Sequence, residues 1–224
     1  MSEATIKTIA IVGGTGKEGK GLAYRWAKSG YSVIIGSRII EKARGAAAEI
    51  NALLEKNQTV SGAENSTAAG MADIVVLTVP YSAHSAMLES IKSEIQGKIL
   101  IDVTVPLVPP KVTRVQMPPD GSAALESQRI LGSGVQVVSA FQNISYEHLL
   151  HDEVVECDVL VCGSNRTSRG IVLQLVEAAG LIGWDAGPLE NSMVVEGMTS
   201  ILIGINKQYG VQSAGIKVSG VPRD

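Results

Sequence analysis

Short apolar runs alternate with longer amphipathic stretches over the first part of the chain. The runs have the length of strands and are largely apolar, which is typical of strands buried on both faces of a sheet. They occupy residues 8–12, 31–35, 72–79, 98–103 and 135–140. The stretches between them repeat apolar residues with helical spacing, at residues 20–29, 41–56, 82–95 and 122–131. This order predicts an α/β protein with a Rossmann-type, doubly wound parallel sheet.

A change of pattern near residue 140 predicts a second, smaller lobe. Strand-like runs at residues 158–161 and 181–185 flank a helical stretch at 167–179, and a long apolar helix is expected at 191–209. We therefore expect a Rossmann domain at residues 1–140 and a smaller C-terminal α/β lobe at residues 141–224. The last helix carries more apolar residues than one buried face needs, which predicts a homodimer interface.

The composition is that of a folded protein without a broad surface for nucleic acid. Hydrophobic residues make up 45% of the 224 residues and charged residues 18%, so the chain can bury a core. The formal net charge of −3 argues against nucleic-acid binding. No apolar stretch reaches the length of a membrane span, and the N-terminus does not resemble a secretion signal. We interpret Cys157 and Cys162 as buried thiols of a cytoplasmic protein.

Residues 14–19 (GTGKEG) match the G-x-G-x-x-G pattern of dinucleotide-binding loops, and they lie between an expected strand and an expected helix. In such loops Gly14 would allow the tight turn, Gly16 would let a pyrophosphate approach the backbone, and Gly19 would let helix and strand pack closely. The helix N-terminus offers free N–H groups to the phosphates. The alternative is an ordinary glycine-rich turn. The residues expected to bind the dinucleotide here are Gly14, Thr15, Gly16, Lys17 and Glu18.

The end of the second expected strand indicates which dinucleotide is bound. An NAD site usually has a carboxylate there for the ribose 2′-hydroxyl. Residues 32–40 contain none, whereas Ser37 and Arg38 end the strand and Lys42 follows one helical turn later. A hydroxyl and two cations suit a 2′-phosphate, so we predict NADP as the cofactor. The alternative is a solvated basic loop.

Four segments together resemble one known family: residues 11–23 (IVGGTGKEGKGLA), 36–38 (GSR), 121–124 (GSAA) and 185–189 (DAGPL). Over essentially the whole chain the sequence is similar to the NADPH-dependent coenzyme F420 reductases, also called F420:NADP oxidoreductases. The resemblance implies reversible hydride transfer between NADP(H) and the deazaflavin coenzyme F420, both of them small-molecule partners. The cofactors carry that chemistry and the protein aligns them, so neither a metal nor a dedicated catalytic residue is expected.

The resemblance also implies where the cofactors lie. Val79 and Pro80 would lie under the diphosphate and ribose, and residues 139–144, with Ala140 and Gln142, would line the ring-stacking region. Archaeal members of the family have a histidine in the segment that ends here with Gln142, and glutamine cannot titrate near neutral pH. His84 lies beside the expected crevice, either as a cofactor contact or as packing at a helix terminus.

Other functions are compatible with the same loop. The chain could reduce another acceptor with NADPH, such as a flavin, a ferric chelate or a small imine or keto compound. It could also be a non-catalytic regulator that binds NADP(H). His148 and His151 are three residues apart but lack the pattern of a metal site, so we interpret them as part of a solvated helix. Asp102 ends a strand and is interpreted as structural rather than as a catalytic acid.

Overall fold

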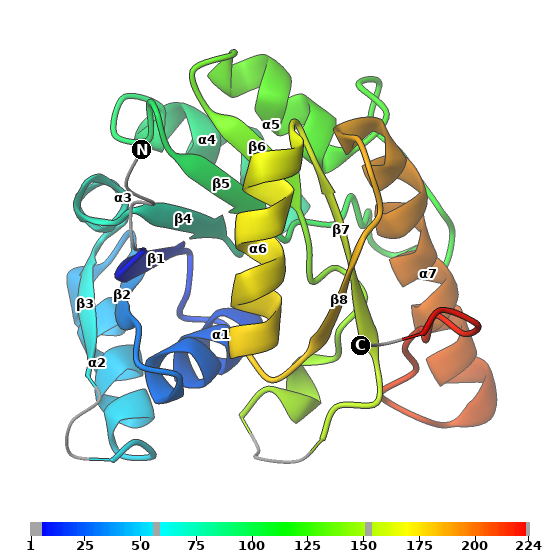
Figure 1. Cartoon of the computed structure of the whole chain (residues 1–224), viewed down its shortest axis with the longest axis horizontal. Coiled ribbons are helices and arrows are strands. Elements are labelled where there is room, and N and C mark those ends of the chain that lie inside the picture. The colour runs from blue at the N-terminus through cyan, green and yellow to red at the C-terminus, as the bar shows by residue number, and fades with distance from the viewer. Residues whose placement is uncertain (1–5, 56–58, 151–153, 223–224) are drawn as a thin grey trace.

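Eight strands form one continuous sheet in the computed structural model, which describes residues 6–55, 59–150 and 154–222 (Figure 1). The strands are β1 (Thr8–Val12), β2 (Ser32–Ser37), β3 (Val60–Glu64), β4 (Ile74–Leu77), β5 (Ile99–Asp102), β6 (Gln136–Ser139), β7 (Asp158–Gly163) and β8 (Ile182–Asp185). Their order is β3-β2-β1-β4-β5-β6-β7-β8, and every pairing is parallel except β6 with β7. The predicted Rossmann-type α/β fold is confirmed.

Helices cover both faces of this sheet. They are α1 (Lys17–Lys28), α2 (Ile40–Asn51), α3 (Asn65–Met71), α4 (His84–Ile91), α5 (Ala123–Leu131), α6 (Arg166–Ala178) and α7 (Ser192–Tyr209), with short 3₁₀ turns η1 (Tyr81–Ala83), η2 (Tyr146–His148) and η3 (Leu189–Asn191). The apolar sides of α1, α2 and α6 share one buried cluster with the sheet, and those of α3, α4 and α5 share a second. Two such cores on opposite faces are what a doubly wound sheet requires, because its strands are buried on both sides.

The sequence pattern gave no sign of β3 and α3. β3 forms the edge of the sheet, and its polar sequence VSGAE is only partly buried, so it lacks a continuous apolar run. A glycine is required at Gly62, because an added Cβ would come within 2.5 Å of the backbone of α2 at Ala43. Because an edge strand is less buried than a central one, its sequence carries a weaker apolar signal.

Several boundaries also differ from the prediction. α1 begins at Lys17 rather than at residue 20, because the N-terminal part of the helix lies inside the glycine-rich loop. α2 ends at Asn51 rather than at residue 56, and Asn51 closes the turn by exchanging side-chain hydrogen bonds with the backbone of Val60. The expected helix at 82–95 is helical as α4 from His84 to Ile91, after the 3₁₀ turn η1.

The sheet continues past residue 140. β6 pairs with β7 through Val138↔Gly163 and Ser139↔Cys162, and β7 then pairs with β8. The C-terminal part of the chain therefore shares the sheet of the N-terminal part, and the division into two domains stays a prediction. Cys162 and Cys157 are buried free thiols, as expected, and the cytoplasmic location also stays a prediction.

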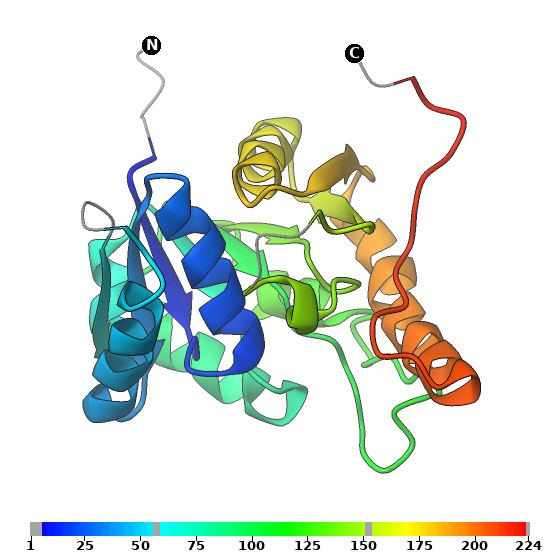
Figure 2. The same cartoon turned by 90° about the horizontal axis from the view of Figure 1, so that it is seen from below.

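α7 lies at the end of the molecule opposite to α2 (Figures 1 and 2). Its buried Glu196 accepts hydrogen bonds from the backbone N–H groups of Ala123 (2.7 Å) and Ala124 (3.1 Å) at the start of α5. Glu196 thereby satisfies two N–H groups at the start of α5 and fixes α7 to that helix. Within the described ranges, α7 and the other helices are too short or too polar to cross a bilayer.

Candidate active site

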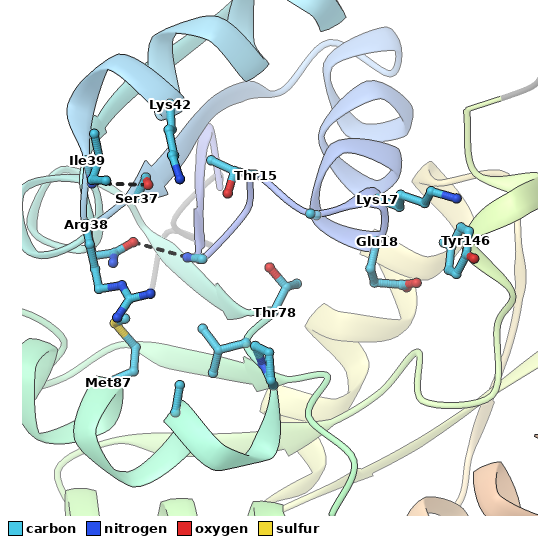
Figure 3. A pocket seen from close by; sticks show the side chains of 17 residues that line it. Thr15, Lys17, Glu18, Ser37, Arg38, Ile39, Lys42, Thr78, Met87 and Tyr146 are labelled. Carbon is cyan, nitrogen blue, oxygen red and sulfur yellow. Dashed lines mark hydrogen bonds between the residues drawn. The ribbon is translucent and has the colours of Figure 1, made fainter. Parts of the chain in front are cut away.

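A cavity of about 600 Å³, here called the loop cavity, lies at the carboxyl ends of the central strands (Figure 3). Its walls come from the segments after β1, β2 and β4 and from the first turn of α1. The chain order reverses at this place, since β1 lies between β2 on one side and β4 on the other. A crevice opens outside the strand ends at such a switch point, and α/β proteins bind their ligands there.

The glycines of the loop have separate roles. Gly14 is buried beneath the loop, where its N–H donates to the backbone oxygens of Ile11 (3.2 Å) and Gly36 (3.1 Å), and it does not line the cavity. An added Cβ at Gly19 would lie 2.5 Å from the Cα of Gly14, so only glycine lets α1 approach the loop. By contrast, an added Cβ at Gly16 would meet nothing within 4 Å. The backbone at Gly16 therefore faces open space at the N-terminus of α1.

One end of the loop cavity is basic. Ser37, Arg38 and Lys42 line it together, as expected, and the Ser37 hydroxyl accepts a hydrogen bond from the N–H of Ile39 (3.2 Å) (Figure 3). Neither Arg38 nor Lys42 forms an ion pair with another described residue. Two exposed cations beside a hydroxyl and a helix N-terminus make a site for a phosphate group.

The opposite end of the loop cavity opens toward two further cavities. The α7 cavity, about 320 Å³, lies between the segment after β6 and α7. The Pro109 cavity, about 420 Å³, lies beside the segment after β5 and is partly walled by Pro109. Val79 and Pro80, which follow β4, line both the loop cavity and the Pro109 cavity. A ligand in the loop cavity would therefore reach a second, separate space.

Four buried side-chain oxygens have no hydrogen-bond partner among the described residues, and all four belong to residues that line the α7 cavity or the Pro109 cavity. They are Glu18 Oε1, Thr104 Oγ1, Gln142 Oε1 and Asn143 Oδ1. A buried polar atom without a partner costs about 1–3 kcal/mol, so folded proteins keep few of them. These unpaired oxygens belong to residues gathered around two adjoining cavities.

The segment after β6 presents Gln142 to the α7 cavity. The amide nitrogen of Gln142 donates to the backbone oxygen of Asp102 (2.6 Å) and to the Ser139 hydroxyl (2.9 Å), which leaves the amide oxygen unpaired. Phe141 has a φ of 73°, a conformation that costs free energy for a non-glycine residue and is frequent at functional sites. Ala140 is fully buried and lines none of the three cavities, so it supports the wall from behind.

His84 does not contact the cavities. The ring is fully buried, with Nε2 2.8 Å from Asp102 Oδ2 and Nδ1 3.3 Å from Glu126 Oε1. Burial lowers the pKa of His84, but the hydrogen bonds and charges of Asp102 and Glu126 outweigh it and raise the pKa above its ordinary value. His84 holds α4, α5 and β5 together, which fits the packing role considered from sequence, and the cofactor contact stays a prediction that this geometry does not favour.

Some residues of the site were not expected from the sequence. Asn65 at the start of α3 accepts a hydrogen bond from the N–H of Gly13 (3.1 Å) and so holds the glycine-rich loop. Tyr146 of η2 closes the loop cavity beside Glu18, with the Lys17 ammonium 4.6 Å from its ring centre. Thr104 could have been found, because polar residues just after a parallel strand lie at the ligand edge of the sheet. The pair His148 and His151 cannot be assessed, because His151 lies outside the described residues.

Comparisons with known proteins show to which family the chain belongs. A sequence profile of the family described as NADP oxidoreductase, coenzyme F420-dependent, matches residues 8–106. The chain is 39% identical to the F420-dependent NADP reductase of Methanocaldococcus jannaschii, over 95% of this chain and 98% of the relative. It is 41% identical to the enzyme of the same name from Methanothermobacter marburgensis, over 96% and 99% of the two chains. The chain belongs to the F420-dependent NADP reductase family.

The fold of the family extends to solved structures of lower identity. A protein from Arthrobacter sp. FB24, provisionally assigned as an F420-dependent NADP reductase, superposes with a TM-score of 0.77 at 23% identity, over 96% of this chain and all of the other. At that identity the likeness shows the fold. The expected family membership is confirmed, and the near-complete coverage of the relatives includes both the loop cavity and the α7 cavity.

Proposed function

We propose that this chain transfers a hydride reversibly between NADP(H) and coenzyme F420, with NADP(H) in the loop cavity. The open backbone at Gly16 and the free N-terminus of α1 suit the pyrophosphate. Arg38 and Lys42 suit the 2′-phosphate. Glu18, the one carboxylate among the described residues that line the cavity, lies at the other end. The nicotinamide would then lie at the end that opens toward the α7 cavity.

Arg38→Ala is expected to weaken NADP(H) binding by about 10- to 150-fold while NAD(H) binding changes little. The reason is the loss of a charge-assisted contact with the 2′-phosphate, worth about 1.5–3 kcal/mol. Calorimetric titration with both nucleotides measures the effect. Arg44→Ala removes an exposed cation of α2 outside the cavity and should bind like the wild type. If Arg38→Ala keeps its preference for NADP, the assignment of this end is wrong.

The gathering of unpaired buried oxygens supports the second half of the proposal. The pyrimidine edge of a deazaflavin offers N–H donors, and Gln142 Oε1 and Asn143 Oδ1 of the α7 cavity are acceptors without a donor. The other walls, such as Leu202 and Ile203 of α7, are apolar and suit a flat ring. We place the deazaflavin in the α7 cavity, against the nicotinamide end of the loop cavity.

In the proposed reaction the protein binds the two cofactors, orients them and excludes water. The two cofactors supply the hydride donor and acceptor. Holding two reactants in the correct orientation can contribute about 7–11 kcal/mol to lowering the barrier. Gln142, fixed by two hydrogen bonds to the backbone of Asp102 and to Ser139, gives the acceptor ring a rigid polar contact.

A turnover assay with a panel of acceptors tests the proposal. The protein is mixed with NADPH and one acceptor at a time: coenzyme F420, a free flavin, a ferric chelate or a small imine. We expect the deazaflavin absorbance to fall rapidly with coenzyme F420, and to rise when NADP and the reduced coenzyme are supplied instead. Turnover with another acceptor but none with coenzyme F420 would contradict the proposal, and NADPH binding without turnover would favour a regulator.

We also propose that two copies of the chain associate through α7. Its outer face exposes apolar side chains at a spacing of one or two helical turns: Val194 is 68% exposed, Ile201 54% and Tyr209 70%. Such a stripe on a monomer would leave apolar area in water that an interface would remove. Light scattering should give twice the chain mass of 23.4 kDa, and a mass of one chain would contradict the proposal.

A further inference from the structure

Glu18 lies where the three cavities meet. It is the second residue of α1, and it alone among the described residues lines the loop cavity, the α7 cavity and the Pro109 cavity. In Figure 3 its carboxyl group extends away from the Arg38 end of the loop cavity and toward Tyr146. Any ligand that spans the loop cavity and any ligand in the α7 cavity would meet at this side chain.

The carboxyl group of Glu18 has no compensating partner. Although the residue as a whole is half-buried, Oε1 is closed off from solvent and receives no hydrogen bond from any described residue. Burial raises the pKa of Glu18 to about 8. In most protein molecules the Glu18 carboxyl group is therefore protonated at neutral pH. A positive charge close to it would lower its pKa and favour the ionised form.

The charged groups around Glu18 do not supply such a charge. The other charged side chains that line the three cavities are Lys17, Arg38 and Lys42. Lys17 turns to the Glu147 carboxylate (3.7 Å) and to the ring of Tyr146, and the other two lie at the far end of the loop cavity. The residues after β4, β5 and β6 that line the three cavities are uncharged. Of the phenols, Tyr146 lies beside Glu18, and Tyr81 donates to Glu126 (2.9 Å).

Resting on the proposed function, we propose that Glu18 carries a proton beside the reduced nicotinamide and releases it when the ring becomes positively charged. When NADPH reduces coenzyme F420, the C4–H bond of the nicotinamide breaks and the hydride, with its electron pair, forms a C–H bond at C5 of the deazaflavin. The nicotinamide is oxidised and gains one positive charge. The O–H bond of Glu18 then breaks, and its proton goes to N1 of the reduced deazaflavin. The carboxylate faces the cationic ring and takes a proton from water after NADP⁺ leaves.

This role makes the choice between the two redox forms depend on pH. An opposite charge within about 4–6 Å lowers the pKa of a carboxyl group by about 1–3 units. Ionised Glu18 therefore favours NADP⁺, and protonated Glu18 favours NADPH. The ratio of the dissociation constant of NADPH to that of NADP⁺ should rise about tenfold or more between about pH 6.5 and about pH 9.5. Titration of the 2′-phosphate cancels in this ratio, because both forms carry it.

The test measures both dissociation constants by calorimetry over that pH range, without coenzyme F420. The wild type is compared with Glu18→Gln, which keeps the size and polarity of the side chain, and with Glu18→Leu, which fills the space with apolar groups. The control is Glu89→Gln, because Glu89 is an exposed carboxylate of α4 that lines none of the three cavities. We expect a pH-dependent ratio in the wild type and the control, and a flat ratio in both Glu18 variants.

The outcomes separate the proposal from the proposed function. Titrations in buffers of different ionisation enthalpy should also show that NADP⁺ binding near neutral pH releases more protons from the wild type than from Glu18→Gln, since the 2′-phosphate contributes equally to both. A flat ratio in the wild type, or an unchanged slope in Glu18→Gln, would overturn the role of Glu18 and leave NADP(H) binding intact. Failure of the wild type to bind either form would overturn the proposed function and the role of Glu18 with it.

Discussion

Gly16→Val is expected to abolish NADP(H) binding while the chain stays folded. The backbone of Gly16, with φ −76° and ψ 172°, is accessible to any residue, and the new side chain would meet no protein atom within 4 Å of its Cβ. It would instead occupy the space at the N-terminus of α1 that the pyrophosphate needs. Losing two or more charged hydrogen bonds of about 1.5–3 kcal/mol each weakens binding by about a hundredfold or more. Calorimetric titration with NADPH measures the loss, and circular dichroism reports the fold.

Gly45→Val is the matched control for this variant. Gly45 also has open space around its Cβ position, but it lies on the exposed side of α2 outside the three cavities. It should bind NADPH like the wild type. Gly16→Ala, with a smaller side chain, should fall between the two. Wild-type affinity in a folded Gly16→Val protein would mean that the loop is a plain turn.

Asp102→Ala is expected to lower the free energy of unfolding by about 3–5 kcal/mol, because it leaves the buried His84 without its main partner. Asp102 is fully buried and accepts hydrogen bonds from His84 (2.8 Å), Ser127 (2.5 Å) and the N–H of Thr104 (2.9 Å). Urea unfolding measures the difference. The surface pair of Asp120 with Arg129 (2.9 Å) gives the comparison, since breaking it should cost at most about 1 kcal/mol. If Asp102→Ala lowered the free energy of unfolding by no more than about 1 kcal/mol, the buried cluster would not stabilise the fold to the extent expected.

The stabilisation that this cluster gives depends on pH, with an upper limit set by His84 and a lower limit set by Asp102. The pKa of His84 is raised in the folded chain, so the stabilisation that His84 contributes is complete below its ordinary pKa and is lost as the pH rises through the folded value. Burial raises the pKa of Asp102, but hydrogen bonds from His84, Ser127 and Thr104 outweigh it and lower the pKa. The contribution of Asp102 is therefore complete above its ordinary pKa and is lost in acid. The stability difference between wild type and Asp102→Ala should be largest between these limits, from about pH 4 to about pH 6.5.

Much of the sheet could be predicted because parallel strands that are buried on both faces leave continuous apolar runs in the sequence. β4, at the centre of the sheet, is the clearest case, and its residues Ile74–Leu77 are all buried. β3 escaped prediction because this edge strand is only partly buried and its sequence lacks a continuous apolar run. The glycine-rich loop was recognisable because the turn leaves no room for side chains at Gly14 and Gly19.

The role of individual side chains was harder to predict, because it depends on contacts between distant segments. His84, for example, lies away from the crevice because its ring is hydrogen-bonded to Asp102 of β5 and Glu126 of α5. Glu18 occupies a position of the loop motif that the motif leaves open, and no pattern along the chain shows that three cavities meet there. The unpaired oxygens of Gln142 and Asn143 could not be predicted either, because they depend on the hydrogen bonds that the amide nitrogens make with distant segments.

Isotope transfer tests the central claim most directly. NADPH carrying deuterium at the transferring position of C4 is mixed with the protein and oxidised coenzyme F420, and the reduced deazaflavin is analysed by mass spectrometry and NMR. Direct transfer between rings held together in a water-excluding site predicts that the deuterium appears at C5 and does not wash out into the solvent. Loss of the label to water, or a deazaflavin that stays oxidised while NADPH is bound, would contradict the account.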